Sequence, residues 1–121
     1  MRLSARKRAP APAPHPDPVK ELKLRSIAAI DGLRRQAARQ TGIYLDEIVR
    51  TSSARRDAPY YFGTSGVMEM EPVFASRIAR AEEGVRTQQE LIISLSERLE
   101  KAVAESGLSD SDLAYLSLEE S

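Results

Sequence analysis

The fold is decided by residues 72–105, which read PVFASRIARAEEGVRTQQELIISLSERLEKAVAE. Mostly apolar side chains recur there at alternating steps of three and four residues, the a and d positions of a heptad repeat, for more than four heptads. A helix of this length spans about 50 Å at ~1.5 Å per residue, so we expect it to need a partner. We assign the nine a and d residues to oligomerisation: Phe74, Ile78, Ala81, Val85, Gln88, Ile92, Leu95, Leu99 and Ala102.

The flanks of this heptad repeat carry further apolar residues. Leu91 falls at position g, Ile93 at b and Val103 at e, so the apolar surface is wider than a two-stranded coiled coil needs. The pattern favours a bundle of three or more helices, or a dimer on which the first part of the chain also packs. Gln88 is the polar member of the d series. It either sets the register of the helices or faces solvent where the bundle widens.

The composition argues against catalysis. The chain has 121 residues, no cysteine, and only 5% aromatic residues within a hydrophobic content of 41%, so it forms one domain at most, with an aliphatic core. The absence of cysteine excludes disulfides and thiolate metal sites. The single histidine, His15, lies among prolines, and the usual nucleophile–base pairs are therefore missing. We expect no catalytic residue, no cofactor and no metal site, and thus a protein that is not an enzyme.

Five segments follow one another along the chain, and the predicted fold class is all-α. Residues 1–17 form a basic arm in which alternating alanine and proline favour an extended chain. Residues 18–56 are a basic helical pair, and residues 57–71 are a loop that contains aromatic residues and glycine. Residues 72–106 are the long heptad helix, and residues 107–121 are a short acidic helix and tail.

Within the helical pair, Asp17 and Pro18 are a typical helix start, and Thr41-Gly42 a typical end. A second helix then covers Ile43 to Arg56. The residues expected on the packed faces are Val19, Leu22, Ser26, Ile27, Ile30, Leu33 and Ala37 in the first helix, and Leu45, Ile48, Val49 and Ser52 in the second.

The C-terminal segment has its own boundary signals. Ser106-Gly107 ends the long helix. Ser109 and Asp112 resemble a capping box, which would open a short helix containing Leu113, Leu116 and Leu118.

The formal charge is zero, but it is divided unevenly. Residues 1–56 carry thirteen Lys and Arg against five Asp and Glu, a net charge of +8, and residues 57–121 carry the reverse, a net charge of −8. One interpretation is that the basic half faces an anionic partner such as nucleic acid. The other is that the two halves neutralise each other within one chain or between neighbouring copies.

Residues 22–51, LKLRSIAAIDGLRRQAARQTGIYLDEIVRT, resemble the ribbon-helix-helix family of DNA-binding proteins. The resemblance implies a short strand, whose outward Lys23 and Arg25 would read bases, followed by two helices around the glycine turn in TGIYLDEIVR. The basic residues that it assigns to nucleic acid are Lys23, Arg25, Arg34, Arg35 and Arg39. The chain departs from the family pattern where Asp17-Pro18 and the spacing from Val19 indicate helix, so residues 20–26 are either strand or helix.

The predicted loop contains PYYFGTSGVMEMEP, residues 59–72. GTSG is not a phosphate-binding loop, because no Lys-Ser/Thr pair follows it and no basic residue lies between Asp57 and Pro72. Tyr60, Tyr61 and Phe62 are residue types that are favoured at protein interfaces, so we assign them to partner contact. The alternative is that they cover the core of their own subunit.

These observations lead to two hypotheses. The first is an oligomer-forming structural or assembly protein, such as a small component of a phage virion or another large complex, with copies of itself and other protein subunits as partners. The second is a DNA-binding transcriptional regulator with a coiled-coil oligomerisation tail. No apolar run approaches the ~20 residues that cross a bilayer. We therefore expect no membrane partner, no signal peptide, and a location in the cytoplasm or a virion.

Overall fold

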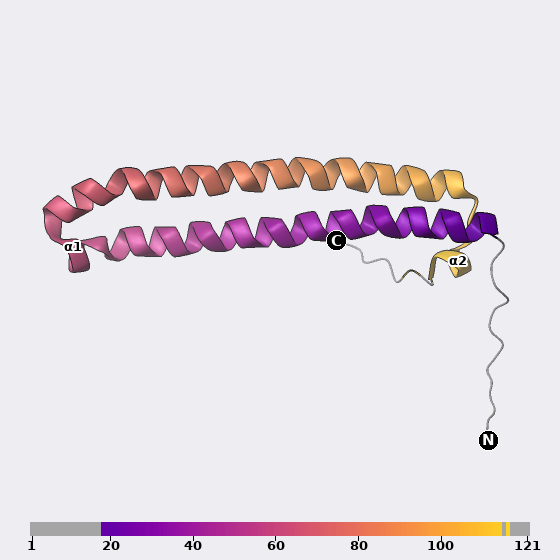
Figure 1. The fold of residues 1–121 in the computed structure, drawn as a ribbon, viewed down its shortest axis with the longest axis horizontal. Helices are drawn as coiled ribbons and strands as arrows, with labels where there is room; N and C mark the ends of the chain where they lie inside the picture. Colours follow the sequence, from indigo (N-terminus) through magenta and orange to yellow (C-terminus); the bar gives the residue numbers. More distant parts are fainter. Residues whose placement is uncertain (1–17, 115, 117–121) are drawn as a thin grey trace, which may run out of the picture.

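The structure, a computed structural model, describes residues 18–114 and 116, and its regular elements are both helical. α1 (Pro18–Ser106) is folded into a hairpin, and α2 (Asp110–Ala114) is a short helix near the open end of that hairpin (Figure 1). The all-α prediction is confirmed for this part of the chain, which contains no strand. The strand alternative for residues 20–26 is wrong, since α1 covers them. The basic arm of residues 1–17, the cap at Asp17 and the position of Leu118 lie outside the described residues.

Gly63 divides α1 into two helical limbs. Its backbone angles, φ 68° and ψ −177°, are not helical, and only glycine adopts this region without strain. We call residues 18–62 the first limb and residues 64–106 the second limb. The limbs lie side by side and run in opposite directions (Figure 1).

The predicted loop at residues 57–71 is wrong apart from Gly63, because the rest of the segment is helical. The predicted break at Thr41-Gly42 is also wrong, so the first limb is one helix and not a pair. A glycine inside a helix costs only about 1 kcal/mol relative to alanine, and packing of the limb outweighs this. Thr41 bonds within the helix, where its Oγ1 donates to the Ala37 carbonyl at 2.9 Å.

The heptad face of the second limb packs within the chain. Four of its nine residues are buried, namely Phe74, Ala81, Leu95 and Leu99, and the other five are half-buried. The partner that the heptad pattern requires is the first limb of the same chain. The assignment of these nine residues to an interface between copies stays a prediction.

The face that the first limb buries differs from the predicted one. Ile27 and Ala37 are buried as expected, together with Asp31, Thr51 and Ala58. Other predicted positions point outward and are exposed: Val19, Leu22, Leu33, Leu45 and Val49. Small and polar residues therefore take part in the seam between the limbs, and a hydrophobic pattern cannot reveal them. Asp31 tolerates burial because Arg34 Nη2 and Arg35 Nε pair with its carboxylate at 2.8 and 2.9 Å.

Three contacts between the limbs show their register. Near the open end, Lys23 Nζ donates to the Ser106 carbonyl at 2.8 Å. In the middle, the ring of Tyr44 lies against the backbone of Gly84. Near the turn, Arg55 Nε donates to Glu71 Oε2 at 3.0 Å.

The predicted end of the long helix and the predicted capping box are confirmed, but α2 is shorter than predicted, because it ends at Ala114 and Leu116 lies in the turn after it. α1 ends at Ser106, and Gly107 follows with a φ of 72°. Ser109 and Asp112 then form a reciprocal capping box: the Asp112 N–H donates to Ser109 Oγ, and the Ser109 N–H donates to Asp112 Oδ2, each at 3.1 Å. This box positions the start of α2.

Candidate functional site

The end of the hairpin at Gly63 is an exposed aromatic surface, which we call the tip and define as Tyr60, Tyr61, Phe62 and Met68. Their exposed fractions are 88%, 78%, 52% and 73%. The alternative in which the aromatics cover the chain's own core therefore does not hold for Tyr60 and Tyr61 within the described structure. A group of large exposed hydrophobic side chains near one end of a molecule is typical of an interaction site.

The two glycines of GTSG shape this tip. Gly63 supplies the positive φ at which the chain reverses. Gly66 lets the chain pass close to Phe62, since a Cβ at position 66 would lie 2.5 Å from the Phe62 Cβ. The motif that invites comparison with a phosphate loop is thus a turn element that presents aromatic side chains.

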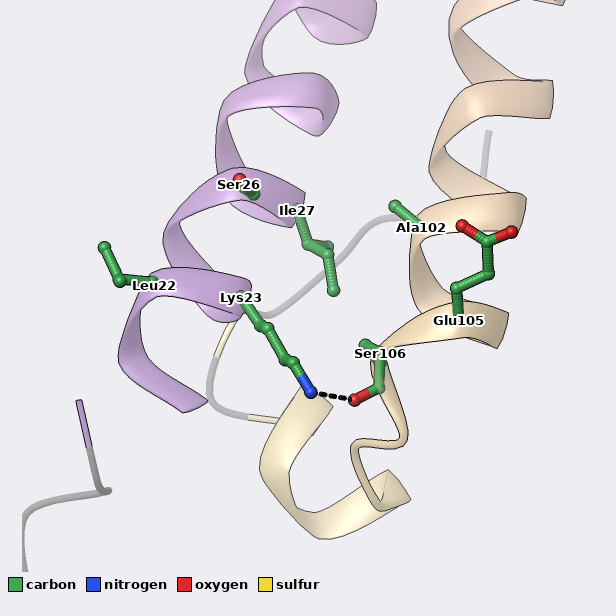
Figure 2. A pocket seen from close by; sticks show the side chains of 7 residues that line it. All are labelled: Leu22, Lys23, Ser26, Ile27, Ala102, Glu105 and Ser106. Carbon is green, nitrogen blue, oxygen red and sulfur yellow. Dashed lines mark hydrogen bonds between the residues drawn. The ribbon is translucent and has the colours of Figure 1, made fainter. Parts of the chain in front are cut away.

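A second surface follows one side of the hairpin, and we call it the groove face. It holds three hollows in a row, of about 300, 430 and 420 Å³ from the open end towards the tip. The first is shown in Figure 2 and is lined by Leu22, Lys23, Ser26, Ile27, Ala102, Glu105 and Ser106. The middle hollow is lined mainly by uncharged residues, namely Leu33, Gln36, Ala37, Gln40, Gln88, Leu91 and Leu95, with Arg98. The third is lined by Tyr44, Glu47, Arg77, Arg80 and Ala81.

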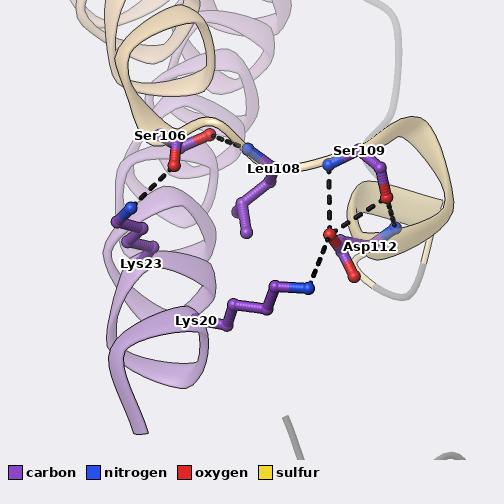
Figure 3. Close-up of polar contacts among 6 residues, drawn as sticks. All are labelled: Lys20, Lys23, Ser106, Leu108, Ser109 and Asp112. Carbon is purple, nitrogen blue, oxygen red and sulfur yellow. Dashed lines mark hydrogen bonds and ion pairs between the residues drawn. The ribbon is translucent and has the colours of Figure 1, made fainter. Parts of the chain in front are cut away.

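Polar contacts close the open end of the hairpin (Figure 3). Besides the bond from Lys23 to the Ser106 carbonyl, the Leu108 N–H donates to Ser106 Oγ at 3.1 Å, and Ser106 Oγ donates to the Val103 carbonyl at 2.7 Å. Lys20 Nζ lies 3.5 Å from Asp112 Oδ2, which ties α2 to the first limb. The carbonyls of Ser106 and Val103, near the end of α1, therefore accept hydrogen bonds from side chains of the protein and not from water alone.

The carboxylate of Asp112 is stabilised in its charged form by its neighbours. The backbone N–H of Ser109, and then its hydroxyl, hydrogen-bond to the carboxylate, and the charge of Lys20 adds to this. Together they lower the pKa of Asp112 below its ordinary value of 3.8. The group therefore serves the capping box and the contact with Lys20, both of which are structural.

The residues assigned to nucleic acid are largely engaged within the chain. Lys23 holds the Ser106 carbonyl, and Arg25 pairs with Glu21 at 2.8 Å. Arg34 and Arg35 hold Asp31. Arg39 is exposed. Because α1 covers residues 22–51, the structure has neither the reading strand nor the two-helix arrangement that the ribbon-helix-helix resemblance implies.

The described residues contain no group of three or more acidic or histidine side chains arranged to hold a metal ion. Neither described helix contains an apolar stretch long enough to cross a membrane. The strongest functional features of this part of the chain are therefore its two exposed surfaces, the tip and the groove face. The sequence singled out the three aromatics of the tip. It also marked several residues that line the groove face, among them Leu22, Leu33 and Leu91, but it did not place them together on one exposed side of the molecule.

Comparisons with protein-family models, with curated proteins and with solved structures find no match to this chain.

Proposed function

We propose that this chain is a non-enzymatic, oligomer-forming structural or assembly protein, built as a helical hairpin that joins copies of itself and neighbouring protein subunits. The observation that carries the proposal is an excess of exposed apolar side chains. The seam between the limbs is already filled, yet thirteen large hydrophobic residues remain exposed among those described. Single exposed leucines are ordinary, but seven of these thirteen belong to the tip and the groove face, namely Tyr60, Tyr61, Phe62, Met68, Leu22, Leu33 and Leu91.

The shape of the hairpin supports this role. Each limb has more than 40 residues, so the molecule is about 65 Å long at ~1.5 Å per residue. Two helices bury only the side chains on the sides where they contact each other, so the core of the hairpin is thin. Long antiparallel hairpins reach a thicker core by packing side by side into bundles. A virion or a comparable multi-subunit complex is the setting that we propose, with the tip contacting neighbouring subunits.

The test is the molar mass of the purified full-length chain in solution, measured by sedimentation equilibrium over a series of protein concentrations. We expect a defined oligomer with concentration-dependent dissociation. A chain that stays monomeric at every concentration, with its helicity intact, would contradict the proposal.

A further inference from the structure

The residues of the groove face are spaced so that its three hollows share one side of the hairpin. On the first limb, Leu22, Ser26, Leu33, Gln36, Gln40 and Glu47 follow at steps of three, four and seven residues. On the second limb, the same steps join Arg77, Ala81, Gln88, Leu91, Leu95, Arg98, Ala102 and Glu105. These intervals keep side chains on one face of a helix. The hollows therefore form one continuous surface.

This surface is nearly symmetric about its middle hollow. The first and third hollows lie about 11 to 12 residues from the middle one, averaged over the two limbs, or about 17 Å along the axis. The middle is also where exposed leucines gather: Leu33 and Leu91, from opposite limbs, are 52% and 44% exposed. Gln36, Gln40 and Gln88 beside them bring amide groups but no charge.

The two ends of the surface differ in charge. Arg77 and Arg80 line the hollow nearest the tip, where Glu47 is the single acid. Glu105 and Lys23 line the hollow at the open end, at the C-terminus of the second limb. Lys23 Nζ is bonded to the Ser106 carbonyl, where it offsets the partial negative charge of the helix C-terminus, and the carboxylate of Glu105 remains. A twofold axis through the middle hollow would bring Arg77 and Arg80 of one molecule to the Glu105 end of the other.

We infer that the groove face binds a second copy of this chain in the antiparallel direction, with the twofold axis at the middle hollow, to form a four-helix bundle. This inference rests on the proposed self-association and specifies its geometry. Leu33 and Leu91 of each copy enter the middle hollow of the other. Arg77 and Arg80 of each copy lie opposite Glu105 of the second copy.

The size of the face fits this occupant. It runs from residue 22 to 47 on the first limb and from 77 to 105 on the second, which is about 40 Å long and about 20 Å wide for two adjacent helices. The resulting footprint of about 800 Å² per copy is that of a standard stable interface. A twofold interface requires one patch that is complementary to itself, and a centre with two exposed leucines, with Arg77 and Arg80 towards one end and Glu105 at the other, meets this requirement.

The first experiment compares two double variants on opposite sides of the hairpin by sedimentation equilibrium. Leu33→Glu with Leu91→Glu places charges at the centre of the groove face, and we expect the dimer dissociation constant to rise at least about 100-fold. Leu45→Glu with Ile93→Glu changes exposed residues on the other side, as matched controls, and should shift the constant less than about threefold. Circular dichroism checks that both variants keep the helicity of the parent.

The outcomes separate this inference from the proposal on which it rests. A monomeric parent chain would overturn both. The parent oligomer could instead persist in Leu33→Glu with Leu91→Glu and dissociate in the control variant. That result would overturn the assignment of the groove face as the interface, while the proposal of self-association would remain. An oligomer that contains a different protein at the groove face would also overturn the inference.

A second experiment tests the direction without disrupting the contact. Because the chain has no cysteine, Arg77→Cys and Glu105→Cys can be prepared as single-cysteine proteins. In the antiparallel dimer, the two cysteines face each other only when the proteins are mixed, so we expect a disulfide-linked heterodimer from the mixture and little linkage from either protein alone. Efficient linkage of each protein with itself would contradict the antiparallel contact and overturn the inference.

Discussion

The ring of Tyr44 in the first limb points directly at Gly84 in the second limb. A Cβ built at position 84 would lie 2.7 Å from three carbons at the end of that ring, closer than van der Waals contact allows. Gly84 is thus the place where the second limb leaves room for the largest side chain near the middle of the seam. The glycine costs helix propensity, and the contact with the ring compensates for it.

We therefore predict that Gly84→Ala destabilises the protein by about 1–2 kcal/mol, because the added methyl group overpacks the seam. The measurement is urea unfolding of the full chain followed by circular dichroism. Gly32→Ala is the matched control. It is also a helical glycine, but nothing lies within 4 Å of its added Cβ, so the substitution should stabilise by about 0.4–1 kcal/mol. Equal stabilisation by both substitutions would show that the ring does not occupy this position.

At the turn, we predict that Gly63→Ala destabilises the hairpin by about 1–3 kcal/mol, because a side chain strains the backbone at φ 68° and ψ −177°. Space is not the cause, since an added Cβ has no neighbour within 4 Å. Gly42→Ala, also without a close neighbour but at a helical backbone, is the control and should not destabilise. Thermal unfolding of the two variants measures the difference, and unchanged stability of Gly63→Ala would contradict the turn geometry.

At the tip, we predict that Tyr60→Ala with Tyr61→Ala changes the unfolding free energy by less than about 0.5 kcal/mol, because both side chains are largely exposed. The same variant should lose the contact with neighbouring subunits. Sedimentation velocity then shows the loss of species larger than the dimer, while circular dichroism stays unchanged. If those larger species persist in the variant, the tip does not contact neighbouring subunits.

At the open end, we predict that Lys23→Met lowers stability by about 1 kcal/mol, because the part-buried bond from Nζ to the Ser106 carbonyl is lost while the aliphatic stem is kept. Arg25→Met is the control, since its exposed pair with Glu21 is worth about 0.5 kcal/mol or less. Chemical denaturation compares the two.

The same two substitutions test the DNA-binding hypothesis. Without a reading strand, we expect duplex DNA to be bound only through charge, with an affinity that falls steeply with salt and shows no sequence preference. Fluorescence anisotropy with duplexes of different sequence measures this. A sequence preference that disappears in the Lys23 and Arg25 variants would contradict the structural role of Lys23.

Acid should release α2 from the first limb. The pKa of Asp112 is lower in the folded chain than its ordinary value of 3.8, so its contribution to stability is fully present above that value. The contribution is lost as the pH falls through the lowered folded pKa. Amide hydrogen exchange in α2, followed as the pH is lowered below about 4, should show this loss in the parent chain. Asp112→Asn should already show fast exchange at neutral pH, whereas Asp110→Asn, at an exposed position in the same turn, should not.

Several parts of the fold follow from short-range pattern. The heptad of the second limb, its end at Ser106-Gly107 and the capping box of Ser109 and Asp112 depend on spacing and on local hydrogen bonds, and all three are as expected. The breaks predicted at Gly42 and around Pro59 depend on local preferences, which amount to about 1 kcal/mol for a glycine and about 3 kcal/mol for a proline inside a helix. Packing along a limb of more than 40 residues outweighs them, which is why only Gly63 interrupts α1.

By itself, the sequence of this protein determined that the chain is helical, that the heptad face needs a partner, and that Tyr60, Tyr61 and Phe62 are an unusual aromatic group. The tertiary structure decided which partner the heptad face receives, and therefore which residues stay outside. Because the first limb folds back onto the second, Asp31, Thr51 and Ala58 enter the seam, and Leu33 and Leu91 remain exposed on the groove face. The physical reason is that a heptad repeat specifies a buried stripe, whereas the chain reversal at Gly63 selects the residues that cover it.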